Sequence, residues 1–295
     1  MVIEMDVIVS IIVGVLEQGF IYGILALGIY ITYRILDFPD LSVDGTLPLG
    51  AAMTAMAIIH GVNPWLAILL SFSAGAFAGF LTGVFHVVFK IKDLLAGIIT
   101  MTGLYSINLM LAGGKAILPI TNQNTIFNST FTKKLSALSI VFLCTIFFKI
   151  ALDLYLKTKS GLLLRGVGDN ETVVTMLGKD SGKVKILGLM LCNGLAATAG
   201  SILCQHQRSF DVNAGTGMLV MGLASVIIGL SLFSRVRFMK GSTMVILGSI
   251  IYKACLSAAL NLNFNPNNLK LLMAVIFLVA LVGKDFIKKG GKKNA

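Results

Sequence analysis

The sequence predicts an all-α, polytopic membrane protein whose helices cross a lipid bilayer about nine times. Of its 295 residues, 56% are hydrophobic and only 13% are charged, whereas a soluble domain carries about 25% charged residues. Apolar runs long enough for a spanning helix, about 18 residues or more, recur along the chain. Strands of a membrane barrel would instead alternate in polarity every second residue. We therefore expect the whole chain, 1–295, to form one transmembrane domain.

Polar interruptions divide the chain into nine predicted spans. The N-terminus lacks the basic residues of a signal peptide, so the first apolar run is expected to stay in the protein as a span. Pro64 and Trp65 mark the start of the third span, because proline suits a first helical turn and tryptophan suits the headgroup region. The spans lie at about residues 7–33, 45–60, 64–89, 94–112, 135–155, 184–204, 217–234, 242–260 and 270–286.

The third span carries small residues at every fourth position, namely Ser71, Gly75, Gly79 and Gly83. Such a stripe allows two helix backbones to approach closely in lipid. It predicts close packing, either inside the bundle or across a homodimer.

Basic residues are divided unequally between the two sides of this predicted bundle. Seventeen of the 24 lysines and arginines fall in loops on the side of the C-terminal tail, and five fall in loops on the other side. Because cytoplasmic loops carry the excess of basic residues, we expect the N-terminus outside and the C-terminus in the cytoplasm. The net charge of +11 is explained in this way without a nucleic-acid partner.

The longest polar interruption, residues 156–185, is cytoplasmic in this orientation. Asp169 or Asn170 can cap a short helix within it, and Gly178 can end that helix in a left-handed turn. Two helical turns are not stable alone in water, so the short helix must dock on its own bundle, on a partner or on the membrane surface. Its apolar face is formed by Val173, Val174, Met176 and Leu177.

Two polar breaks interrupt the apolar pattern, at residues 37–46 and 205–217. Asp44 or Ser42 can cap the second span. Alternatively, each break folds back into the bundle and lines a cavity, where non-helical backbone is tolerated at membrane depth. Polar residues inside the spans are explained equally well by hydrogen bonds between helices. On the cavity hypothesis, the predicted translocation path comprises Asp40, Ser42, Asp44, Thr46, Thr100, Asn108, Asp211 and Asn213.

The two breaks share a short pattern. Phe38-Pro-Asp40 precedes Gly45-Thr46, and Phe210-Asp211 precedes Gly215-Thr216. Paired interruptions at corresponding positions of two halves point to a transport path. Because the first break faces inside and the second faces outside, the pattern fits an inverted repeat, and chance similarity explains so short a pattern equally well.

The sequence offers little support for catalysis or metal binding. It lacks the GxxxxGK[ST], HExxH and GxSxG motifs, and its three histidines occur singly near span ends. The four cysteines lie in or beside apolar runs without CxxC spacing. We therefore expect no enzymatic activity, no metal site and no cofactor.

Three separated segments resemble the motifs of one family. Arg165-Gly-Val-Gly-Asp-Asn-Glu171, followed by Gly178, resembles the R-A-x-G-x-N signature of bacterial ABC-importer permeases of the branched-chain amino acid and ribose type. Ile227-Ile-Gly-Leu-Ser-Leu-Phe233 is similar to the second-half pattern V-x-G-G-x-S-L-F. The segment 34–46 looks closest to the tryptophan/tyrosine-type permeases. The resemblance covers residues 15–285, with Gly166, Thr175 and Leu230 departing from the motifs.

The resemblance implies the membrane subunit of an ATP-driven importer in the bacterial plasma membrane, for an amino acid or a similar small solute. It implies a permease homodimer, a cytoplasmic ABC ATPase that hydrolyses the ATP, and an extracytoplasmic substrate-binding protein. Carried over by position, the residues that couple the permease to the ATPase are Arg165, Gly168, Asp169, Asn170 and Gly178.

A competing hypothesis comes from the carboxylates alone. Acidic residues at membrane depth are candidates for ion sites. Asp40, Asp44 and Asp211 could thus serve an ion-coupled secondary transporter as proton or sodium sites.

Overall fold

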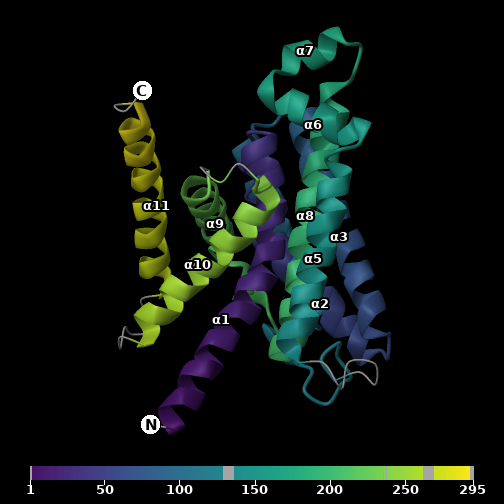
Figure 1. Cartoon of the computed structure of the whole chain (residues 1–295). Coiled ribbons are helices and arrows are strands. Elements are labelled where there is room, and N and C mark those ends of the chain that lie inside the picture. Colours follow the sequence, from purple (N-terminus) through teal and green to yellow (C-terminus); the bar gives the residue numbers. More distant parts are fainter. Residues whose placement is uncertain (1, 129–135, 235, 237, 262–268, 293–295) are drawn as a thin grey trace.

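The computed structural model describes residues 2–128, 136–234, 236, 238–261 and 269–292, with side chains between residues 9 and 282 of these ranges, except 269 and 270. Figure 1 shows a bundle of long helices with a short helical pair at one end. The first half comprises α1 (Val2–Ile29), the π-helix η1 (Tyr30–Ile35), α2 (Val43–Ile59), α3 (Pro64–Val87), α4 (Asp93–Leu111), β1 (Ile117–Pro119) and α5 (Ala137–Tyr155). The rest comprises α6 (Lys159–Asp169), α7 (Glu171–Met176), α8 (Ser181–Gln207), β2 (Ser209–Asp211), the 3₁₀ turn η2 (Val212–Gly215), α9 (Met218–Leu232), α10 (Gly241–Asn261) and α11 (Leu269–Lys292).

The helices confirm the predicted class of a polytopic helical membrane protein. Seven of the described helices are long and apolar enough to cross a bilayer, and two shorter apolar helices cover 43–59 and 271–282. Each predicted span overlaps one of these nine segments. Lys133, Lys134, Arg235, Arg237 and Lys293, which entered the count of basic residues, lie outside the described residues.

Helix α8 forms the centre of the bundle. Of its most apolar 18-residue window, 78% is buried inside the protein, whereas no other spanning helix exceeds 44%. The small residues of α3 lie against it: a Cβ on Gly75 or Gly79 would overlap the carbonyl oxygen of Asn193 or Leu189. The stripe on the third span therefore serves packing within the bundle.

The sequence did not predict a sheet. Strands β1 and β2 pair antiparallel, with Ile117 opposite Asp211 and Pro119 opposite Ser209. Each strand has only three residues, which is too short for a period-two pattern to be read. The pair joins the loop after α4 to the break after α8.

Helices α2 and α9 both begin inside the bundle. The segment that precedes α2 is bonded to Asn193, at the middle of α8. A Cβ on Gly215, just before α9, would overlap the carbonyl oxygen of Asp44 in α2. In Figure 1, α2 and α9 extend from this level toward opposite ends of the molecule. A long helix, a polar break and a shorter helix thus occur twice in opposite directions, as an inverted repeat predicts.

Candidate functional site

A buried polar cluster ties the first break to the central helix. Both oxygens of the Asp40 carboxylate accept hydrogen bonds, Oδ1 from the Ser42 hydroxyl at 2.6 Å and Oδ2 from Asn193 Nδ2 at 2.7 Å. Thr46 Oγ1 donates to Asn193 Oδ1 at 2.6 Å. All four residues are fully buried. Among the described residues, no lysine, arginine or histidine forms an ion pair with Asp40, so hydrogen bonds alone hold this carboxylate in the bundle.

Asp44 belongs to α2, and its carboxylate bonds to the backbone at the start of α9. Its Oδ1 accepts from the Leu219 amide at 2.7 Å and its Oδ2 from the Gly217 amide at 3.0 Å. The residue before α9 is Gly217, which has a φ of +83° and no side chain to cap the helix. Because the first amides of a helix have no partner within it, they need an acceptor from elsewhere. Asp44 supplies that acceptor from α2.

The interpretation of Ser42 or Asp44 as the cap of the second span is therefore wrong. Ser42 precedes α2, but its side chain makes no capping hydrogen bond. Its hydroxyl is occupied by Asp40 and Asn193. Each side chain instead holds a distant element, α8 in one case and α9 in the other.

A cavity of about 420 Å³ lies between α2, α4 and the η2 break. Asp44, Asn108 and Asn213 line it, together with Tyr105. Asn108 is fully buried; its Nδ2 donates to the Gly45 carbonyl at 3.0 Å, and its Oδ1 has no partner among the described residues. Leaving a buried acceptor unpaired costs about 1–3 kcal/mol. A residue of the cavity lining thus carries an acceptor that no other described residue occupies.

Pro48 interrupts the hydrogen bonds of α2 at the same wall. It lies inside α2 and lines the cavity. Proline has no amide hydrogen, so it cannot donate to the carbonyl four residues earlier, which belongs to Asp44. Pro48 was not among the predicted path residues, although a proline within a predicted span is a visible signal of a missing helix hydrogen bond.

Six of the eight predicted path residues belong to the buried cluster around Asp40 or to the cavity between α2, α4 and η2, and two lie elsewhere. Thr100 lies elsewhere: it accepts a hydrogen bond from Thr82 at 2.9 Å and joins α3 to α4. Asp211 caps η2 by accepting from the Asn213 amide at 2.8 Å. Asp40, Ser42 and Thr46 form the buried cluster, and Asp44, Asn108 and Asn213 line the cavity. Asn193, the partner common to that cluster, was absent from the predicted path.

The polar interruption 156–185 contains the short helix that its sequence predicts. Asn170 Oδ1 accepts from the amides of Thr172 at 3.0 Å and Val173 at 3.3 Å, so Asn170 is the cap of α7. Asp169 instead ends α6. Gly178 adopts a φ of +71° just after α7, as a left-handed helix terminus requires.

The apolar face of α7 is largely uncovered in this chain. Val174 is buried, whereas the exposed fractions of Met176 and Leu177 are 81% and 67%. Val173 is also exposed. A small apolar face that remains exposed at the end of a bundle is typical of an interaction site.

Both helices of the α6–α7 segment contact the bundle. A Cβ on Gly168 would overlap the carbonyl oxygen of Ile35, so α6 packs directly on the end of η1. Lys185 Nζ donates to Glu171 Oε2 at 2.8 Å, and this hydrogen bond is the largest cause of the lowered pKa of Glu171. Arg165 and Asp169 line a second cavity beside η1.

Comparisons with known proteins agree with this architecture. The model of the family described as "Branched-chain amino acid transport system / permease component" matches residues 11–282. A tyrosine transport system permease protein of Clostridioides difficile (strain R20291) is 44% identical over 96% of this chain and 95% of its own length. A ribose import permease protein of Haemophilus influenzae is 26% identical over 96% of this chain and 86% of its own length.

A solved structure supports the fold. PsaBC from Streptococcus pneumoniae, in complex with a Fab, aligns with a TM-score of 0.52 at 16% identity, over 90% of this chain and 89% of that chain. Family model and relatives together confirm the resemblance drawn from the three motifs. The chain therefore belongs to the family of permease components of branched-chain amino acid transport systems, and it is a membrane permease of an ABC-type importer.

Proposed function

We propose that this permease carries an amino acid across the bacterial plasma membrane and that the cavity between α2, α4 and η2 is part of its path. The observation that carries this proposal is the convergence of Asp44, Asn108 and Asn213 on this cavity, where Asn108 Oδ1 has no partner among the described residues. If the Asn108 amide turns toward the cavity, its oxygen offers an acceptor to an ammonium group. Met101 and Tyr105 in the same wall offer apolar surface to a side chain. The tyrosine transport relative makes tyrosine the first substrate to test.

Coupling to a cytoplasmic ABC ATPase is assigned to the loop 165–178. The exposed Val173, Met176 and Leu177 would dock in the groove of the ATPase, which hydrolyses the ATP. Movement of α7 would pass through α6 to η1, because Gly168 touches Ile35. From η1 the chain runs directly into the Asp40 cluster and to Asp44. The coupling residues on this proposal are Arg165, Gly168, Asp169, Asn170 and Gly178.

The proposed orientation puts α7 and the end of α11 in the cytoplasm and the start of α1 outside. In Figure 1, α6, α7 and the end of α11 lie at one end of the molecule and the start of α1 at the other. The excess of basic residues in the loops on the side of α7 supports this orientation. The assembly would contain two copies of this permease and an extracytoplasmic substrate-binding protein.

The ion-coupled alternative has less support. Asp40 and Asp44 have separate hydrogen-bond partners, and Asp211 caps η2. The three carboxylates therefore do not share a site. One observation favours an ion-binding role: Asp40 is buried, and no basic side chain among the described residues pairs with it.

Reconstitution tests the proposal. Proteoliposomes that contain the permease, its ATPase and its binding protein should accumulate radiolabelled tyrosine only with ATP. In a second experiment, cysteine-substituted Thr172 should crosslink to the ATPase. Asp169→Lys should abolish uptake while membrane levels of the permease stay normal. Uptake driven by an imposed ion gradient without the ATPase would refute ATP coupling.

A further inference from the structure

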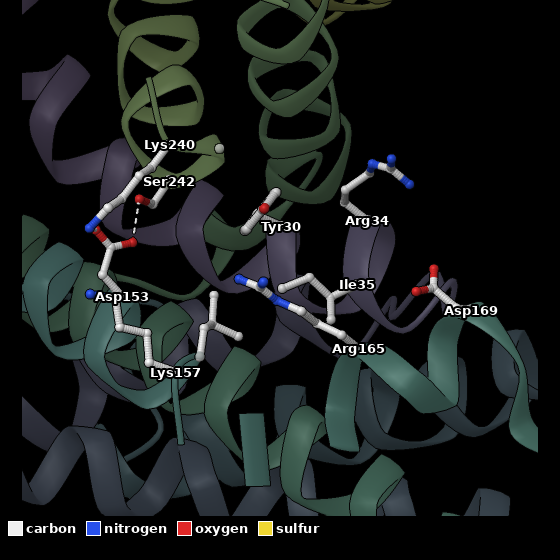
Figure 2. A pocket seen from close by; sticks show the side chains of 11 residues that line it. Tyr30, Arg34, Ile35, Asp153, Lys157, Arg165, Asp169, Lys240 and Ser242 are labelled. Atoms are coloured by element: carbon white, nitrogen blue, oxygen red, sulfur yellow. Dashed lines mark hydrogen bonds and ion pairs between the residues drawn. The ribbon is translucent and has the colours of Figure 1, made fainter. Parts of the chain in front are cut away.

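A second cavity, of about 500 Å³, lies at the end of the bundle that carries α6 and α7. Its walls come from η1, from the end of α5, from α6 and from the start of α10. Figure 2 shows Arg165 reaching from α6 into the middle of the cavity, with Arg34 and Asp169 toward one edge. Lys157 and Tyr30 also line it.

Three of the cations in this cavity have no acidic partner in the described part of the chain. Asp153, a carboxylate in the wall, is already bonded to Lys240 at 3.1 Å, to Lys149 at 3.3 Å and to the Ser242 hydroxyl at 2.6 Å. Among the described residues, no ion pair or side-chain hydrogen bond engages the three remaining cations or the wall carboxylate Asp169. The unpaired cations are Arg34, Lys157 and Arg165. Three unpaired cations against one carboxylate leave a surplus of positive charge.

Tyr30 adds a neutral hydrogen-bond donor to the three cations of the cavity. Tyr30 lies against the start of α10, where a Cβ on Gly241 would come within 2.5 Å of the phenolic oxygen. Within the described part of the chain, its hydroxyl makes no hydrogen bond. The hydroxyl is thus available to an acceptor in the cavity.

The depth of the cavity corresponds to the lipid headgroups. Three apolar spans end or begin at its walls: 9–35 ends beside Arg34, 137–155 ends beside Lys157, and 241–261 begins after Lys240. Phe238, two residues before Lys240, is 100% exposed. Exposed aromatic side chains at the end of a span are typical of the membrane interface.

We propose that this cavity binds a phosphate group, carried by an anionic phospholipid or as free phosphate. Guanidinium groups match the oxygens of phosphate in a fixed, two-pronged geometry. Basic pockets between spanning helices on the cytoplasmic side bind lipid headgroups. Arg34 and Arg165 contact the phosphate from η1 and α6, Lys157 adds charge and Tyr30 donates a hydrogen bond. The bound phosphate thereby joins α6 to the end of the first span and steadies the segment that carries α7.

Binding to the purified full-length permease tests the inference without the ATPase or transport. Native mass spectrometry would measure retention of phosphatidylglycerol and of phosphatidylcholine, and thermal unfolding would be followed with inorganic phosphate. We expect selective retention of phosphatidylglycerol, weakened roughly ten-fold in Arg34→Gln, because one charged hydrogen-bond partner of the phosphate is lost. Arg34→Lys, which keeps the charge, should lose less. Stabilisation by inorganic phosphate without selection between the lipids would identify free phosphate as the ligand.

Lys183→Gln is the matched control, since the Lys183 side chain is 84% exposed and lies outside the cavity. It should bind like the unmodified protein. Equal retention of both lipids, no stabilisation by phosphate and no difference between Arg34→Gln and Lys183→Gln would overturn the inference. That outcome would leave the proposed transport function untouched, because neither measurement involves uptake.

Discussion

Single polar residues position the two breaks of this permease. Asn193 was visible in the sequence as an amide within an apolar span, but its partners lie about 150 positions earlier in the chain. Asp44 likewise bonds to amides more than 170 positions later. Sequence spacing predicts contacts within one helix, where neighbours lie three or four residues apart. Contacts between separate helices depend on the packed bundle, so the capping interpretation of Asp44 was wrong.

Asn193→Leu should strongly destabilise the protein. It removes the donor to Asp40 Oδ2 and the acceptor of the Ser42 and Thr46 hydroxyls. Losing partners of buried polar groups costs about 1–3 kcal/mol for each group, and more for a charged one. Thermal unfolding in detergent would measure the loss.

Thr198→Val is the control for this prediction. Thr198 is also fully buried in α8, but its hydroxyl donates only to the Gly194 carbonyl of its own helix. Its replacement should cost far less. Equal losses in the two variants would mean that the cluster around Asp40 contributes no special stability.

Helices α6 and α7 illustrate what the sequence could predict of an element. The capping residues and Gly178 predicted α7 correctly because these signals are local. The packing of Gly168 on Ile35 was not predictable in the same way, since it joins α6 to an element more than 130 residues earlier. The sequence pattern requires a glycine there, and the structure gives the reason.

Gly168→Ala should therefore force α6 away from η1. The added methyl group would overlap the Ile35 carbonyl oxygen, which is backbone and cannot rotate away. Overpacking of this kind typically costs about 1–3 kcal/mol. We expect a lower unfolding temperature and weaker ATP-dependent uptake.

Gly166→Ala, two residues away, provides the comparison. Its new Cβ would meet only the Val174 Cγ2 methyl, at 3.1 Å. A side-chain methyl can shift, so this variant should keep both stability and uptake. A loss in Gly166→Ala equal to that in Gly168→Ala would contradict the importance of the Ile35 contact.

The exposed face of α7 yields a prediction about association. Met176→Asp changes a side chain that is 81% exposed, so the permease should remain as stable as before. If Met176 anchors the ATPase, copurification and uptake should fall roughly ten-fold or more, as for a buried interface residue. Leu162→Asp, which changes a 58% exposed residue of α6, should leave copurification intact. Normal copurification of Met176→Asp would place the ATPase contact elsewhere.

At the scale of the whole molecule, hydropathy and charge predicted the nine apolar segments, because each segment must satisfy its own backbone hydrogen bonds in lipid. The sheet between β1 and β2 escaped prediction, since two three-residue strands lack a readable period. The sequence also predicted only some of the residues that line the cavity between α2, α4 and η2. Asp44, Asn108 and Asn213 were predicted for the path, but Pro48 and Tyr105 were not. Their convergence follows from the opposed directions of α2 and α9.

The same architecture predicts where a substrate should protect the protein from a thiol reagent. Thr216 is exposed and lines the cavity beside the start of α9. Cysteine-substituted Thr216 should react with a small thiol reagent, and tyrosine should slow that reaction several-fold by filling the cavity.

Cys255, the exposed cysteine among the four, must first be replaced by alanine, whereas Cys144, Cys192 and Cys204 are buried. Cysteine-substituted Thr121, exposed in the turn after β1 and outside the cavity, should react at one rate with or without tyrosine. Because α2 and α9 meet at this cavity and belong to opposite halves of the molecule, ATP binding in the full complex should also change the reactivity at residue 216. Equal rates at residue 216 under all these conditions would remove the cavity from the transport path.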